Sequence, residues 1–516
     1  MKLFKSYTQT QVMLLPPSLS EMLDEKDLCQ VVSKVIDGLD LRALSTSFSG
    51  GGCPSYHPVM MLKVLVYAYS QNLYSSRKIA KAVKRDVGYM WLSGMQRPDF
   101  NTINRFRSNY LKDSLEKVFS EVLIFLLDNN YIKNEDYFID GTKMEANAGK
   151  HTHVWSKNTK RYKEKVESRV KAILAEIDEL NRAEDAEYEG EDLPEYGERS
   201  SVSSQDIDKV VSSINEKLIS STNKSSKKRK SQVKELKSLS EKLVKYEEQE
   251  RTLAGRNSYS KTDHDATFMR PKNDTEDIRP MYNVQMGSEN GFVVGYSVHQ
   301  NPNDAANFKG HMDFRSSLKI PTPGCIVGDS IFGTEENYEY LRKHKIRNFL
   351  KYPEFHKELR EEVKPFSKAD FEYDKEDDCF ICPADNELNL VEFCKEVSKT
   401  GFQSKLKIYR CNDSSTCGFK SQCSNSSKGR TIRINLRLDK FKRQAKKNLT
   451  SEQGVTLRKR RENEIESIFG DIKYNQRFRR FNLRGLAKVK AETALLAISL
   501  NIRKIALLCS AQPITI

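Results

Sequence analysis

The 516-residue chain lacks an uninterrupted apolar run of the length needed to cross a bilayer. Its most apolar stretch, residues 491–510, is broken by Glu492, Arg503 and Lys504. The first 21 residues hold only a short apolar run that ends in a Pro-Pro pair, which is not the pattern of a signal peptide. We therefore expect neither a membrane protein nor a secreted one, and we predict a cytoplasmic location.

Cysteine is scarce, and six of the 10 cysteines lie between positions 379 and 423. A secreted disulfide scaffold would be shorter and richer in cysteine, so we expect reduced thiols or thiols bound to a metal. A C-x2-C pair followed by two C-x5-C spacings is compatible with a tetrahedral structural Zn²⁺ site. The candidate ligands are Cys382, Cys411, Cys417 and Cys423. The alternative is reduced cysteine packed inside a small insert.

Acidic residues are outnumbered by basic ones, 71 to 86, and the formal net charge is +15. The excess is local, because residues 430–490 contain 19 Lys and Arg against 6 Asp and Glu. A solvated helix face would normally mix the two signs. We interpret the segment as a phosphate-binding surface and expect a polyanion as the partner.

Residues 1–135 have a helical pattern. Apolar residues recur at helical spacing over residues 57–71, a second helix is expected over residues 75–83, and Asn101 is a candidate cap for a third. Short helices with basic side chains at the surface are compatible with a helix-turn-helix-like DNA reader. These basic side chains are Arg77, Lys78, Arg105 and Arg107. The alternative is a helical dimerisation domain.

Two predicted strands carry an aspartate at their ends. Residues 137–142 form an aromatic and β-branched run with Asp140 at its tip, and residues 325–329 form a second run ending in Asp329. A helix is expected after the second strand, over residues 334–344. An aspartate in such a place is also a common turn former.

A helical hairpin is predicted to interrupt this strand-rich region over residues 155–256, with a loop over residues 183–204. After it, Asn-Gly separates two β-rich runs, residues 282–286 and 292–299. That dipeptide between strands predicts a β-hairpin.

Glu466 is a third candidate acid, on a basic helix. Three carboxylates, Asp140, Asp329 and Glu466, provide the hard oxygen ligands that hold two Mg²⁺ or Mn²⁺ ions in phosphoryl-transfer enzymes. Glu462 and Glu464 compete for the role of the third acid.

Lys473 lies two helical turns after Glu466, on the same expected face. Such an acid and cation suit a DNA end lying along the helix, although an ordinary pair on a solvated helix has the same spacing. Further arginines, interleaved with Phe478 and Phe481, extend the predicted DNA-binding surface. They are Arg477, Arg479, Arg480 and Arg484.

Several motifs in a fixed order resemble one family over nearly the whole chain. They are LLPPSLSEML, SYHPVMMLKVLVYAYSQNLYSSRKI, WLSGMQRPDFNTINRFR, FIDGTKMEANA, YSKTDHDATFMRPK, YNVQ, HQNPNDAANF, GDSIFGTEENYEYL and ESIFGDIKYNQRFRRFNLRG. The chain resembles the DDE transposases of bacterial insertion sequences, in the long-chain subgroup with an InsH-like N-terminal domain. By this resemblance the catalytic acids are Asp140, Asp329 and Glu466, with a Glu-x6-Lys spacing to Lys473.

Two residues depart from the family pattern. The upstream arginine of related signatures has no clear counterpart, and Arg461 is the nearest candidate. Phe332 stands where a tyrosine is usual.

The resemblance implies an α/β chain with a ribonuclease-H-like mixed sheet and helices on both faces. The predicted parts are a helical N-terminal domain (1–135), the first part of the catalytic core (136–352, with the insertion 155–256), a Cys-rich insert (353–430), and a basic catalytic helix with a C-terminal core helix (431–516).

The resemblance also implies a reaction: metal-dependent cleavage at the ends of an insertion sequence, then strand transfer into target DNA. The implied partners are double-stranded DNA and a second copy of the chain, with nucleoid association when bound. No nucleotide cofactor is expected, and the chain has no G-x4-G-K-[ST] phosphate loop. The alternative function is that of a catalytically inactive DNA-binding protein or repressor derived from a transposase.

Overall fold

The computed structural model describes residues 18–45, 55–185, 203–220, 226–271, 277–360, 366–367, 370–411, 417–424, 426 and 429–511. The chain forms two compact units. One contains Met1–Met144 with Asn283–Ile516, and the other is Glu145–Tyr282. The candidate catalytic residues all belong to the first unit.

Short helices make up the N-terminal part of the first unit. They are η1 (Leu19–Met22), α1 (Leu28–Asp37), α2 (Arg42–Ser45), α3 (Pro58–Ser70), α4 (Ser76–Ala82), α5 (Val87–Leu92), α6 (Phe100–Arg105), the π-helical turn η2 (Phe106–Tyr110) and α7 (Leu115–Asp128). The helices predicted over 57–71 and 75–83 are confirmed. The predicted cap Asn101 is wrong, because the Asp99 carboxylate accepts the Thr102 N–H at 2.7 Å and caps α6.

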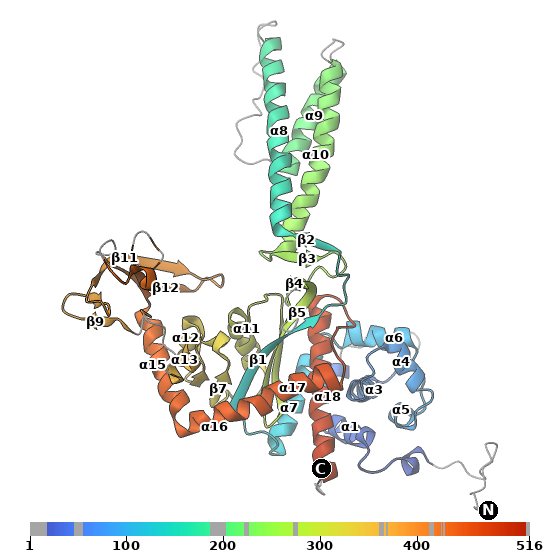
Figure 1. Cartoon of the computed structure of the whole chain (residues 1–516). Coiled ribbons are helices and arrows are strands. Elements are labelled where there is room, and N and C mark those ends of the chain that lie inside the picture. The colour runs from blue at the N-terminus through green and yellow to red at the C-terminus, as the bar shows by residue number, and fades with distance from the viewer. Residues whose placement is uncertain are drawn as a thin grey trace, which may run out of the picture. The chain divides into compact units, whose positions relative to one another are not determined.

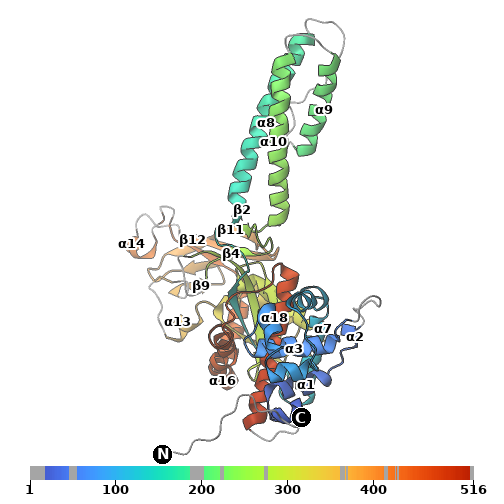
Figure 2. The same cartoon turned by 90° about the vertical axis from the view of Figure 1, so that its right-hand side faces the viewer.

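The C-terminal helix α18 (Leu486–Ala511) packs against α1, α3 and α7 and against strand β6 (Phe292–His299) (Figures 1 and 2). Residues 486–510 are long and apolar enough to cross a membrane, but 72% of their most apolar window is buried inside the protein. This burial is the property of a core helix.

The core sheet is mixed. Its order is β4-β5-β1-β7-β8, with β6 paired to β5. The strands of the first unit are β1 (Asp136–Glu145), β5 (Arg279–Glu289), β6, β7 (Cys325–Gly328) and β8 (Arg347–Leu350). β1, β7 and β8 run parallel, whereas β5 and β6 form an antiparallel hairpin. The predicted hairpin is confirmed, and its turn residues Asn290 and Gly291 have φ of 52° and 70°, as a type I′ turn requires.

Asp140 does not lie at a strand tip, which corrects the sequence-based prediction. β1 continues to Glu145, although its pairing with β7 ends at Ile139. The strand passes through Asp140 and Gly141 instead of ending there.

Helical elements follow the strands of this sheet: α11 (Asp304–Ser317), η3 (Ser330–Phe332), α12 (Glu335–Lys343) and α13 (Phe355–Leu359). The helix expected over 334–344 is therefore present. A mixed α/β core with a helical N-terminal region is the fold class that the sequence predicted.

The Cys-rich region forms an antiparallel five-stranded sheet of order β13-β12-β11-β10-β9. Its elements are β9 (Glu372–Asp374), β10 (Cys379–Ile381), β11 (Glu387–Val397), β12 (Gln403–Cys411), α14 (Lys420–Cys423) and β13 (Thr431–Ile434). Phe380, Leu388 and Tyr409 belong to its small core. The chain then enters α15 (Leu436–Thr450) and α16 (Glu452–Arg461), and α16 packs against β7.

The second unit contains three long helices that run side by side, α8 (Ser156–Asp185), α9 (Ser204–Ser220) and α10 (Ser226–Leu253) (Figures 1 and 2). Their core is aliphatic, with Val170, Ile173 and Leu236 fully buried. Most of the loop predicted over 183–204 lies outside the described residues. The short strands β2 (His153–Trp155), β3 (Ser258–Ser260) and β4 (Thr267–Met269) complete this unit.

Candidate active site

Two aspartates lie side by side on neighbouring segments of the core sheet. β1 and β7 are parallel, and the last residues that they pair are Ile139 and Gly328. Asp140 and Asp329 come next in each segment, so the parallel register brings them side by side.

Local hydrogen bonds hold both carboxylates. The Gly141 N–H donates to Oδ1 of Asp140 at 2.8 Å, and the Ser330 N–H donates to Oδ1 of Asp329 at 2.7 Å. Asp140 is 8% exposed. A Cβ at Gly141 would lie 2.3 Å from Nε2 of Gln285, so a larger residue there would require that side chain to shift. Asp329 begins the short helix η3 as its N-cap, which orients the side chain.

Arg461 connects Asp140 with the third candidate acid. Its Nη1 donates to Oε1 of Glu466 at 3.0 Å, and its Nη2 lies 3.4 Å from Oδ2 of Asp140. The Arg461 side chain is 6% exposed, whereas the Glu466 side chain is 53% exposed. One buried guanidinium therefore bridges a buried aspartate and a glutamate that still faces solvent.

A π-helical turn explains the unusual spacing of this arginine. Residues Glu462–Glu466 form the π turn η5, followed by α17 (Ser467–Gly470) and a second π turn, η6 (Asp471–Asn475). A π turn adds one residue to the helical repeat, so residues five positions apart stand one turn apart. The sequence left open whether Arg461 is the upstream arginine of the family pattern. The π turn places it one turn before Glu466.

Lys473 also reaches β1. Its Nζ hydrogen bonds to Oγ1 of Thr142, which is 3% exposed. Thr142 and Asp140 are two positions apart on β1 and share one face of the strand. Glu466 through Arg461, and Lys473 through Thr142, are therefore both tied to the strand that carries the first aspartate.

Glu464 has a different role from Glu466. It is 9% exposed, its Oε1 pairs with Arg460 at 3.2 Å, and its Oε2 accepts the Gly291 N–H at 2.6 Å. It thus ties the helix to the turn of the β5–β6 hairpin. The other competitor, Glu462, is exposed.

Lys351 is a further residue near the acids, which the sequence analysis missed. Its backbone N–H donates to the Gly328 carbonyl at 3.3 Å, immediately before Asp329. Burial lowers the pKa of the Lys351 ammonium; Arg461 lowers it further, and Asp329 opposes this. Lys351 directly follows strand β8, which pairs in parallel with β7. Recognition of β8 in the sequence would have placed Lys351 next to Asp329.

The side chains of Asp140, Asp329 and Glu466 have the chemistry of ligands for divalent metal ions. All three supply hard carboxylate oxygens, and two of them are aligned by the sheet. Within the described parts of the chain, no three His, Cys, Asp or Glu side chains stand together at metal-binding spacing. At this site the cation between the acids is the Arg461 guanidinium.

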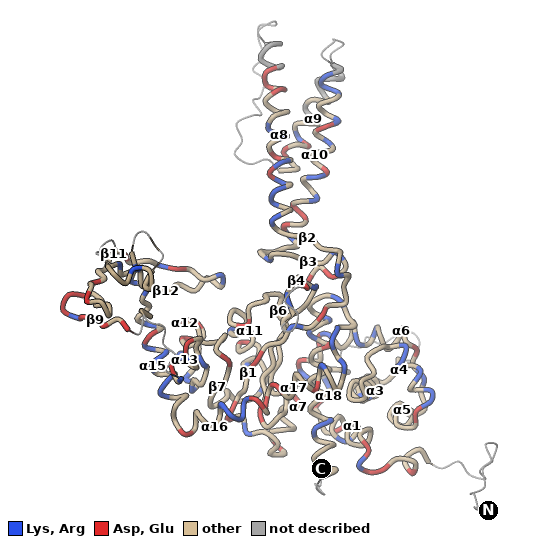
Figure 3. Tube along the Cα trace, in the orientation of Figure 1, with Lys and Arg blue, Asp and Glu red and all other residues tan. Residues whose placement is uncertain are grey.

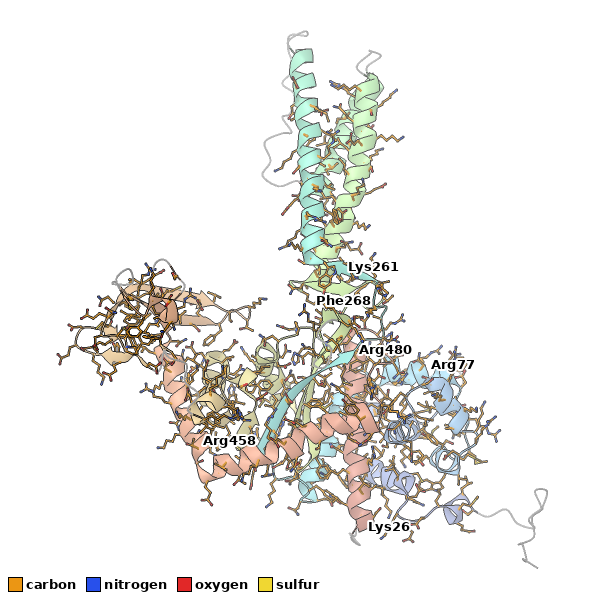
Figure 4. All side chains as sticks on the ribbon, in the orientation of Figure 1. Lys26, Arg77, Lys261, Phe268, Arg458 and Arg480 are labelled. Atoms are coloured by element: carbon orange, nitrogen blue, oxygen red, sulfur yellow. The ribbon has the colours of Figure 1, made fainter. Side chains whose placement is uncertain are left out.

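The basic loop between η6 and α18 is exposed. Arg477, Arg479, Arg480 and Arg484 all face solvent, while the interleaved Phe478 and Phe481 are buried. Lys and Arg also recur along α15 and α16 (Figure 3), and Figure 4 labels Arg458 on α16 and Arg480 in the loop. Arg477 has φ of 54° and ends the helix in the left-handed conformation.

Buried residues hold this basic loop in place. The Asn482 and Leu483 N–H groups each donate to Oε2 of Glu492 at 3.0 Å. The Tyr74 hydroxyl donates to the Gln476 carbonyl at 2.8 Å. The helical N-terminal region therefore supports the loop directly.

Arg107 is not a surface residue, which corrects the sequence-based prediction. It is 2% exposed, and its Nη1 donates to the Tyr69 hydroxyl at 2.9 Å and to the Tyr74 carbonyl at 2.7 Å. Its guanidinium is buried and hydrogen bonds to other residues of the protein, so it is not accessible to DNA. Arg77, Lys78 and Arg105 are exposed, as predicted.

The cysteine candidates gather in one place. Cys382, Cys411, Cys417 and Cys423 all line the same small cavity of the Cys-rich sheet region.

Comparisons with known proteins match two segments of the chain. The family described as "Transposase DDE domain" matches residues 381–506, a range that contains Glu466 and the basic loop. The family described as "Transposase domain (DUF772)" matches residues 17–109, which contain α1 to α6. The comparison with curated proteins found no match.

Proposed function

Because the chain is a DDE transposase of the insertion-sequence type, we propose that it cuts DNA at the ends of its element and joins them to target DNA. Transposases act on DNA, and the DDE family depends on divalent metal ions. Asp140, Asp329 and Glu466 are the proposed metal ligands, and Mg²⁺ or Mn²⁺ is the proposed metal. The parallel register that aligns Asp140 with Asp329 is the observation that carries this assignment.

The reaction has two chemically similar steps. In cleavage, a water oxygen bonds to the phosphorus at the element end, the P–O3′ bond breaks, and a free 3′-OH and a 5′-phosphate result. In strand transfer, that 3′-oxygen bonds to a target phosphorus, loses its proton, and displaces a target 3′-OH. Bound Mg²⁺ or Mn²⁺ would activate the attacking oxygen and stabilise the leaving oxygen.

The side chains around the acids have separate proposed roles. Asp140 lies within β1 and Asp329 directly follows β7, and backbone N–H groups orient the oxygens of both. Glu466 stands on a helix and is exposed, which leaves it accessible to metal and to DNA. Lys473, from the adjoining turn, is proposed to neutralise a phosphate next to the scissile bond.

DNA is proposed to lie along the basic loop and the neighbouring helices. Arg477, Arg479, Arg480 and Arg484 supply the phosphate contacts there, and Arg105 is a second candidate on the N-terminal helices. A ribonuclease-H-like core is the proposed fold, because three parallel strands, an antiparallel hairpin and a helical third acid agree with it. A homodimer is proposed, since two element ends must be held together, and bound DNA would place the protein in the nucleoid.

The test is a cleavage assay on labelled DNA that covers both flanks of the coding region. Wild type and Asp329→Asn are compared with and without Mg²⁺. The proposal predicts one defined cut at each flank, made by wild type in Mg²⁺ alone. Specific binding by wild type without any cut would contradict it and would support a non-catalytic repressor.

A further inference from the structure

Four cysteines surround one small cavity in the Cys-rich region. The cavity measures about 20 Å³, and Cys382, Cys411, Cys417 and Cys423 line it together with apolar side chains such as Phe371 and Leu388. The four thiols come from three places: the end of β10, the end of β12, and the segment around α14. A cavity of this volume has room for one water-sized occupant and none for an organic ligand.

The two remaining cysteines of the cluster lie elsewhere. Phe380 packs into the same small core as Cys382 and Cys411, and successive side chains of a strand point to opposite faces. Cys379, directly before Phe380, therefore faces away from the cavity. Cys394 lies on β11 beside Phe393, which is 71% exposed. The sequence left open which four of the six cysteines are the ligands. The structure leaves four candidates, because Cys379 and Cys394 lie away from the cavity.

Hydrogen-bond donors already point at two of these sulfurs. The backbone N–H groups of Ala384 and Asn386 both donate to Sγ of Cys382 at 3.4 Å, and Nδ2 of Asn386 donates to Sγ of Cys417 at 3.6 Å. Hydrogen bonds of this kind orient the ligands of a metal site.

We propose that Cys382, Cys411, Cys417 and Cys423 together bind one structural Zn²⁺ ion. Four thiolates complete a tetrahedral shell and leave no position for water or substrate, which is the property of a structural site. In the part of the chain that the structure describes, the thiols surround the cavity without standing at ligand spacing. Zinc binding therefore draws them inward around an existing cavity.

The site has a defined mechanical role. β12 is fastened to the catalytic core where the Ser404 hydroxyl donates to Oε2 of Glu335 at 2.6 Å, and Asn435 donates to the same oxygen at 2.7 Å. Asn435 is also the N-cap of α15, which leads into α16 and on to Glu466. Zinc would thus stabilise the small sheet from which the catalytic helical segment starts.

Zinc content of the full-length chain tests the proposal, and it does not depend on cleavage activity. Elemental analysis of protein purified without chelator is expected to give about one zinc per chain. Cys417→Ser is expected to lose most of that zinc, whereas the matched control Cys394→Ser keeps it. Replacement of zinc by Co²⁺ is expected to give the strong visible absorption of a tetrahedral thiolate site. Less than about half an equivalent in wild type, or equal loss in both variants, would overturn the proposal.

A measurement on wild type covers the case in which Cys417→Ser fails to fold. Native protein is treated with a thiol reagent before and after removal of metal by a chelator. The proposal predicts that four additional thiols become reactive once metal is removed, identified by mass spectrometry as Cys382, Cys411, Cys417 and Cys423. Reactivity that the chelator leaves unchanged would overturn it.

Discussion

Two arginine–carboxylate networks of the first unit differ in their access to solvent. In one, Arg107 donates to the Tyr69 hydroxyl, which donates to Oε1 of Glu492 at 3.0 Å; Glu492 is 0% exposed and also accepts two backbone N–H groups. In the other, Arg461 is equally buried, but its partner Glu466 has a side chain that is 53% exposed.

The contrast separates structural charges from candidate catalytic ones. Glu492 is surrounded by donors from the protein itself, so its charge serves to fix the basic loop against the N-terminal helices. Glu466 is held by a single arginine and keeps an open side toward solvent. The two networks have similar composition, and what distinguishes them is which partner is left accessible.

The largest expected effect concerns the three acids. Asp140→Asn, Asp329→Asn and Glu466→Gln should each reduce strand cleavage by a factor on the order of a thousand, because metal stabilisation of the transition state contributes several kcal/mol. Cleavage kinetics and DNA binding would be measured together, and binding should persist. The matched control is Glu462→Gln, on an exposed glutamate of the same turn, which should cleave normally. Normal cleavage by any of the three variants would remove that acid from the site.

Substitution of Arg107 in the buried network with Tyr69 and Glu492 should lower the stability of the fold. Arg107→Met removes the hydrogen bonds to the Tyr69 hydroxyl and the Tyr74 carbonyl and should lower the free energy of unfolding by about 1–3 kcal/mol. The control is Arg105→Met, at an exposed neighbouring position, which should change the free energy of unfolding by less than about 0.5 kcal/mol. Urea unfolding of both variants checks the difference. Equal stability would mean that Arg107 is not a structural residue.

Removal of Arg461 should act on the metal. Because its guanidinium lies between Asp140 and Glu466, Arg461→Ala should strengthen Mn²⁺ binding by about fivefold in the absence of DNA, which corresponds to about 1 kcal/mol of repulsion removed. Titration followed by electron paramagnetic resonance measures the affinity. Weaker binding would show that Arg461 supports the metal site instead of competing with the ion.

The smallest expected effect concerns the basic loop. Arg477→Gly removes a charge at a position with φ of 54°, where glycine is the favoured residue, so the fold should be preserved. DNA binding should weaken for all sequences alike, and the slope of log affinity against log salt should become shallower by about 1. Binding measured at several salt concentrations decides this. An unchanged slope would place the DNA elsewhere.

Local patterns in the sequence were sufficient to predict much of the core sheet. The apolar runs before Asp140 and Asp329 and the Asn-Gly turn specify strands within a few residues. Parallel pairing of the two runs then aligns the acids without further information.

Other features depend on partners distant in the chain. Nothing near Arg107 signals its burial, because Tyr69 and Glu492 lie far away in sequence. The π turn that aligns Arg461 with Glu466 departs from the regular α-helical period, so residue spacing alone does not predict this pairing. The choice of Cys382 over Cys379 agrees with the cavity, but the cavity itself follows from the packing of the small sheet.

A change of metal preference tests most directly whether Asp329 binds the proposed catalytic metal. Cleavage by Asp329→Cys would be compared with wild type in Mg²⁺ and in Mn²⁺. Mg²⁺ avoids sulfur, whereas Mn²⁺ is the more thiophilic of the two ions. If Asp329 binds the metal, the variant is inactive in Mg²⁺ and regains measurable cleavage in Mn²⁺. Cleavage by the variant in Mg²⁺ at the wild-type rate would contradict this assignment of Asp329.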